Sequence, residues 1–207
     1  MVFISLQEIF DIIIMTVVVG IIFSDTFKGY GIKPNQEQDV TNPEYYKKYY
    51  SLWNRIGVDK EAIKFAIIVT APAIVLHELA HKFVALAFGI AAIFHASYFG
   101  LSIGLILKVV FPGFVFFIPG YVEITSTIQP LIHSAVAFSG PAMNLILWLG
   151  SAFILKNHNL RKKLKGNWPI IFHMTKKINM FLFIFNMLPI PIFDGFKVYE
   201  GIIRSFF

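Results

Sequence analysis

Long apolar runs, separated by shorter polar stretches, dominate the pattern of this chain. Four of the runs approach or reach the 17–25 mostly apolar residues, roughly, that a helix needs to cross a bilayer. They are Ile9–Phe23, Ile63–Gly89, Leu131–Leu155 and Pro169–Pro189. The first run is short, and Lys176 and Lys177 interrupt the last. The pattern predicts an all-α membrane protein, a multi-pass helical bundle of about four spans.

One further segment, Ala91–Gly120, has a mixed pattern. Leu101–Ile118 is apolar enough to be taken for a span, but it includes Lys108 and a Pro-Gly pair, a second pair follows it, and it is rich in Val, Ile and Phe. β-branched and aromatic residues favour strands, and Pro-Gly pairs mark turns. We therefore expect this segment to enter the bilayer and return as a small re-entrant β-hairpin.

The apolar runs divide the chain into three expected parts. Residues 1–62 hold the first span and a loop, Ser24–Lys60, that carries both acidic and basic residues. Its run Tyr45-Tyr46-Lys47-Lys48-Tyr49-Tyr50 is typical of a segment at headgroup depth, and a plain solvated loop is the alternative. Residues 63–195 form the core, and 196–207 a short amphipathic helix.

Composition supports a membrane protein and excludes some chemistry. Of the 207 residues, 57% are hydrophobic and 14% are charged, whereas soluble proteins carry about 25% charged residues. The net charge of +6 does not indicate nucleic acid as a partner, because most basic residues lie between the apolar runs, where they meet lipid headgroups or water. Without cysteine, a metal site must use His, Asp or Glu.

The strongest motif is His77-Glu78-Leu79-Ala80-His81, inside the second apolar run. Residues i and i+4 share one face of a helix, so the two imidazoles can bind a single ion. Glu78 is close enough to take a proton from a water on that ion. This is the pattern of a zinc hydrolase, and its apolar setting places the hydrolysis in or near a bilayer.

A catalytic zinc needs a third protein ligand and keeps one position for water. The candidate is Asp194, which follows the prolines that end the fourth run. A carboxylate in apolar surroundings is costly unless it is paired or metal-bound. The alternative is that Asp194 caps the helix that follows it.

This ligand set constrains the topology. His77, His81 and Asp194 can meet only if the second and fourth helices end at the same face of the membrane. The chain must then cross an odd number of times between Gly89 and Pro169, and Leu131–Leu155 supplies one crossing. For this reason too, Ala91–Gly120 is expected to be re-entrant.

Two asparagines stand in apolar surroundings and need hydrogen-bond partners. Asn144 ends the motif Gly140-Pro141-Ala142-Met143-Asn144 in the third run. It can contact substrate backbone or the re-entrant segment, or it can link helices. Asn186, at the end of the fourth run, has the same alternatives, or it can stabilise the oxyanion of a tetrahedral intermediate.

Together, the motifs from His77 to His81, from Gly140 to Asn144 and from Asn186 to Gly195 resemble those of the site-2 protease family of intramembrane zinc metalloproteases. The resemblance covers roughly Ile63 to Gly195. It implies a multi-pass protein of the cell membrane that hydrolyses membrane-embedded or membrane-adjacent peptides. By the same resemblance His77, His81 and Asp194 bind one zinc ion and Glu78 is the base. The alternative is a membrane zinc-binding protein without proteolysis, a metal carrier or a pseudoenzyme.

The orientation in the membrane stays open. The loops Ser24–Lys60 and Lys156–Asn167 hold eleven Lys and Arg residues, and the opposite side is expected to hold Lys108, Lys197 and Arg204. The positive-inside rule favours a cytosolic location for the two loops. The family resemblance implies instead that the zinc lies nearer the cytosolic face.

Overall fold

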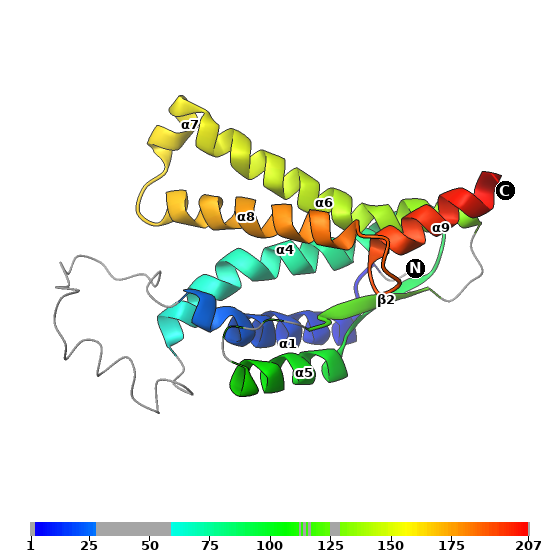
Figure 1. Cartoon of the computed structure of the whole chain (residues 1–207), viewed down its shortest axis with the longest axis horizontal. Helices are drawn as coiled ribbons and strands as arrows, with labels where there is room; N and C mark the ends of the chain where they lie inside the picture. The colour runs from blue at the N-terminus through cyan, green and yellow to red at the C-terminus, as the bar shows by residue number, and fades with distance from the viewer. Residues whose placement is uncertain are drawn as a thin grey trace.

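The computed structural model describes residues 3–27, 59–111, 113, 115, 117–124 and 129–206. Its elements (Figure 1) are α1 (Leu6–Phe23), the 3-10 helix η1 (Ser24–Phe27), α4 (Lys60–Ala87), β1 (Ala92–Ala96), α5 (Tyr98–Val110), β2 (Gly120–Ile124), α6 (Pro130–Lys156), α7 (His158–Lys163), α8 (Trp168–Asn186) and α9 (Asp194–Phe206). Residues 28–58, with the tyrosine-lysine run, lie outside the described residues.

The long helices form a bundle around α4. In Figure 1, α6 and α8 lie on one side of α4, and α1 and α5 lie on the other. The helices α4 and α8 run in the same direction, and α6 runs in the opposite one. The single long crossing between α4 and α8 is therefore the odd crossing that the ligand set requires.

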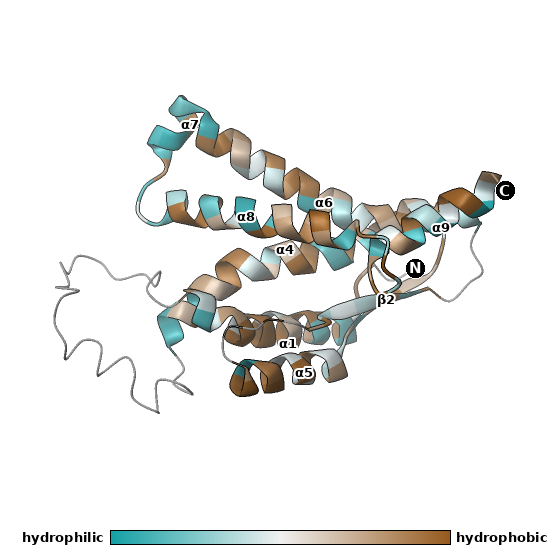
Figure 2. Ribbon diagram, viewed as in Figure 1, coloured by the Kyte–Doolittle hydropathy of each residue, from teal (hydrophilic) through white to brown (hydrophobic). Residues whose placement is uncertain are grey.

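The described helices α4, α6 and the continuous segment Leu6–Phe27 are long and apolar enough to cross a membrane. The fourth predicted span, α8, is a helix of 19 residues, but it is less apolar than these three. Figure 2 shows hydrophobic residues along the long helices and hydrophilic ones at α7. Large apolar side chains point outward from the bundle, among them Ile13, Ile146 and Phe153, each more than half exposed. The prediction of a helical membrane bundle with a small hairpin is confirmed.

The segment Ala91–Gly120 returns to its starting point, as expected, but its centre is helical. β1 and β2 pair antiparallel, with His95 opposite Tyr121. Between them the chain forms α5, capped by Ser97, whose Oγ accepts a hydrogen bond of 3.2 Å from the Gly100 amide. The expectation of strands within Leu101–Val110 was wrong, because packing of α5 on α1 outweighs the small β preference of its Val and Ile residues.

The helix α5 also carries Lys108 to an unexpected place. Its ammonium group donates to Ser24 Oγ at 2.6 Å and lies 3.3 Å from Asp25 Oδ2, at the C-terminal end of the first span. The expectation that Lys108 lies on the side opposite the loop Ser24–Lys60 was wrong, because a 13-residue helix runs back along α1. This adds one more basic residue to the side that holds the two basic loops.

At the other end of the bundle, α9 packs on the start of α6. Ser134 Oγ donates to the Val198 carbonyl at 2.9 Å. A Cβ on Gly201 would lie 2.5 Å from the Pro130 carbonyl oxygen, so this close approach requires glycine. The expected C-terminal helix thus exists and begins at Asp194. The division of the chain at residues 62 and 195 stays a prediction.

Candidate metal centre

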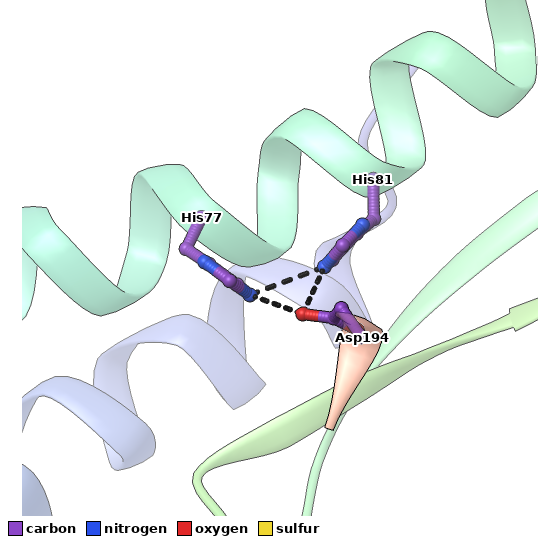
Figure 3. A group of neighbouring side chains, drawn as sticks. All are labelled: His77, His81 and Asp194. Carbon is purple, nitrogen blue, oxygen red and sulfur yellow. Dashed lines mark hydrogen bonds and ion pairs between the residues drawn. The ribbon is translucent and has the colours of Figure 1, made fainter. Parts of the chain in front are cut away.

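The helix α4 presents His77 and His81 on one face, one turn apart. Their Nε2 atoms lie 3.1 Å from each other. Asp194, the first residue of α9, reaches both from the opposite side, with Oδ2 at 3.0 Å from His77 Nε2 and 3.3 Å from His81 Nε2. Figure 3 shows the three side chains converging on one point. Within the described part of the chain, these residues form a group that can hold a metal ion.

The turn between α8 and α9 places Asp194. The helix α8 ends at Asn186, ahead of Pro189 and Pro191, because proline disfavours a helical residue before it and lacks an amide donor. A Cβ on Gly195 would lie 2.5 Å from the Met187 carbonyl carbon, so glycine lets α9 begin directly against the end of α8. The hydroxyl of Tyr199 donates to the Met187 carbonyl at 2.9 Å and fixes the same junction.

Gly140 leaves room for the two histidines. It faces α4 from α6, and a Cβ at this position would lie 2.3 Å from His81 Nε2 and 2.6 Å from His77 Nε2. No side chain can occupy that space without displacing the imidazoles. The glycine of the Gly-Pro motif is therefore a steric requirement of the site.

The other ring nitrogens of the two histidines are held by the protein. His77 Nδ1 lies 2.6 Å from Asn144 Oδ1, and His81 Nδ1 lies 2.8 Å from the Val136 carbonyl oxygen. Asn144 Nδ2 donates to the Ala73 carbonyl and to Asn179 Oδ1, each at 2.9 Å, so its Oδ1 is the acceptor for His77. Both Nδ1 atoms thus carry the proton, and both Nε2 lone pairs point into the site.

The donor set fits zinc. Two imidazole nitrogens and a carboxylate oxygen that face one another repel unless a cation lies between them. Ligand atoms about 2.0–2.1 Å from a tetrahedral zinc lie about 3.3 Å apart, close to the 3.0–3.3 Å observed. A metal ligand must be deprotonated, and a cation held at this point would offset the cost of burying the Asp194 carboxylate.

Glu78 and the metal group share one cavity of about 760 Å³. Glu78 is 8% exposed. Its carboxylate makes no hydrogen bond with the other described residues, whereas every fully buried side-chain oxygen among the described residues has a hydrogen-bond partner. Its oxygens are therefore open to the cavity. The residues that line it come from α4, the segment before β2, β2, α6, α8 and the turn before α9, and most of them are apolar.

The structure separates the two asparagines that the sequence singled out. Asn186 lines the cavity, and its role as an oxyanion or substrate contact stays a prediction. Asn144 is fully buried behind His77 and does not line the cavity. Its contacts favour the link between helices over a contact with substrate. Sequence reasoning missed Asn179, which completes this buried chain; the available signal was an amide inside an apolar helix.

Comparison with known proteins identifies the family. The chain is 38% identical over 134 residues to a protein of Methanocaldococcus jannaschii named "Putative zinc metalloprotease MJ0611", covering 64% of this chain and 68% of that protein. The chain belongs to this family of zinc metalloproteases. A second family member, "Putative zinc metalloprotease YwhC" of Bacillus subtilis, is 26% identical over 156 residues, covering 67% of this chain and 69% of that protein.

No protein-family model and no solved structure matches the chain with significance. Membership of the zinc metalloprotease family therefore rests on these relatives, and the converging His77, His81 and Asp194 are in accord with it. The cofactor of this metalloprotease is one zinc ion.

Proposed function

We propose that this metalloprotease cleaves peptide bonds within or beside the bilayer of the cell membrane, in the manner of the site-2 proteases. The observation that carries the proposal is the position of the three candidate metal ligands. His77, His81 and Asp194 lie at a cavity lined in part by α4 and α6, two helices long and apolar enough to span a membrane.

The chemistry follows from the residues at the cavity. Zinc, when bound, lowers the pKa of a coordinated water to about 7 and polarises the scissile carbonyl. His77, His81 and Asp194 would hold the ion, and Glu78 would accept the proton of that water and return it to the leaving amine. We propose that Asn186, which lines the same cavity, donates to the carbonyl oxygen of the substrate.

The substrate has to be extended at the site, because a helix hides its own amides. The strand β2 offers an edge for an extended peptide. Alternate residues of a strand point their backbone groups to opposite edges. The backbone N–H and C=O groups of Tyr121 and Glu123 point toward β1. Those of Gly120, Val122 and Ile124 therefore point away from β1, and these three residues line the cavity. A substrate strand that pairs with this edge lies in the cavity with its backbone held.

The test is Glu78→Gln in lipid vesicles with a labelled single-span substrate. We expect one zinc per chain in the parent and the variant, with cleavage in the variant reduced at least 10²–10⁴-fold, roughly the contribution of a general base. The matched control is Glu61→Gln, the same change at a partly exposed residue of α4, which should cleave at the parental rate. Retained cleavage in Glu78→Gln contradicts the proposal. A zinc-loaded parent that cleaves no membrane substrate favours the non-proteolytic zinc protein instead.

A further inference from the structure

Two acidic residues inside the apolar helix α1 have no part in the metal centre. Glu8 is 3% exposed and Asp11 is 1% exposed. Carboxylates buried in a membrane-spanning helix are costly and are retained where they have a function. Both contact the strand β1, which lies far from them in sequence.

Glu8 joins three elements through one atom. Its Oε1 accepts hydrogen bonds from the Lys82 ammonium and, at 2.8 Å, from the Phe94 amide. Its other oxygen accepts from the Ser5 amide at 2.7 Å, within the cap of α1. Lys82 is 1% exposed and directly follows the metal-site residue His81. A single carboxylate oxygen thus connects β1, by hydrogen bonds, to the turn of α4 that carries His81.

Asp11 makes the same kind of contact with β1, two residues further along the strand. Its Oδ2 accepts from the Ala96 amide at 3.2 Å, and its Oδ1 accepts from the Tyr98 hydroxyl and, at 3.1 Å, from Gln7 Nε2. Phe94 and Ala96 are the residues of β1 whose backbone groups point away from β2. The two carboxylates therefore bind the outer edge of the hairpin at Phe94 and Ala96. Among the described residues, the outer edge of β2 stays open to the cavity.

We propose that Glu8, Asp11 and Lys82 are positioning residues that fix the register of the hairpin relative to the metal site, and thereby select the peptide bond that is cut. This inference rests on the proposed function. A substrate paired with β2 is placed along the cavity by β2, and β2 is placed by β1. A slip of two residues would keep the same faces and move the substrate by about 6.6–6.8 Å, far enough to bring another bond to the site.

The test removes the acceptor on Glu8 without leaving a buried charge. Glu8→Met with Lys82→Met replaces the ion pair with apolar side chains of similar length, an exchange that folds tolerate well. We expect parental zinc content, a KM about tenfold higher, the scale of one lost hydrogen bond, and products cut at several neighbouring bonds instead of one, as read by mass spectrometry.

Three further variants separate positioning from general stability. Glu8→Gln with Lys82→Met keeps an acceptor for the Phe94 amide and should restore cleavage at the single parental bond. Glu61→Met with Lys64→Met replaces an exposed ion pair on the same helix and should change neither KM nor cleavage position. Tyr98→Phe, at a side chain that is half exposed, removes one hydrogen bond to Asp11 and should also give products cut at several neighbouring bonds. This variant tests the positioning role if the Met pair does not fold.

The outcomes distinguish this inference from the function on which it rests. If the parent protein cleaves no membrane substrate, both the proposed function and the positioning role are contradicted. The positioning role alone is overturned if the parent cuts one bond and both variants behave like it. In that outcome the Met pair and Tyr98→Phe cut only the parental bond, with the parental KM.

Discussion

The Oδ1 atom of Asn144 lies 2.6 Å from Nδ1 of His77, so an amide on α6 fixes the tautomer of an imidazole on α4. The same amide donates to the Ala73 carbonyl and to Asn179 of α8. One buried side chain thereby couples the packing of three helices to the orientation of a metal-site histidine. Groups in this position affect metal affinity without contacting the metal.

Replacing Asn144 with Ala should lower zinc affinity by about 10–100-fold, the usual cost of losing such a support. Asn144→Asp keeps an acceptor for His77 and should lose less. The measurement is zinc competition with a chelator of known affinity. Asn159→Ala, at an exposed asparagine of α7, is the control and should bind zinc like the parent. Equal affinity in Asn144→Ala and the control would show that the amide serves only helix packing.

Gly140→Ala should abolish zinc binding, because the added methyl group would lie 2.3 Å from His81 Nε2. Gly150 offers a matched control on the same helix, since nothing lies within 4 Å of a Cβ there. Gly150→Ala should bind zinc normally and be stabilised by up to about 1 kcal/mol through the better helix propensity of alanine. Zinc analysis and thermal unfolding of the two variants in parallel measure both effects. Normal zinc content in Gly140→Ala would mean that α6 does not constrain the histidines as described.

Each motif of this site is local in sequence, and this is why so much of the site could be predicted. The two histidines lie one helical turn apart, and the prolines before Asp194 end the helix that precedes it. The direction of α8 followed from the demand that Asp194 reach the histidines. These inferences needed only helix geometry and the cost of a buried carboxylate.

What the sequence did not reveal depends on contacts between distant segments. Whether Leu101–Val110 is strand or helix was decided by its packing on α1, which the residue types within the segment do not encode. The pairing of Glu8 with Lys82 and Phe94 joins residues 74 and 86 positions apart. Asn179 gains its meaning only through Asn144, on another helix.

Zinc should stabilise the folded protein by mass action. At free zinc about 100-fold above its dissociation constant, the free energy of unfolding rises by about 2.7 kcal/mol. Removing zinc with a chelator should therefore lower the unfolding temperature of the parent, and adding zinc back should restore it. The Gly140→Ala variant should respond to neither treatment. An identical response in this variant would assign the stabilisation to zinc bound elsewhere.

The central claim is that His77, His81 and Asp194 hold one zinc ion that supports peptide cleavage. The most direct test compares the zinc content of the purified protein with that of Asp194→Ala, both assayed against a labelled single-span substrate. Glu200→Ala, on the same helix, controls for changes in α9. We predict one zinc per chain and cleavage in the parent and the control, with both lost or sharply reduced in Asp194→Ala. Unchanged zinc content in Asp194→Ala would remove this residue from the site and contradict the account.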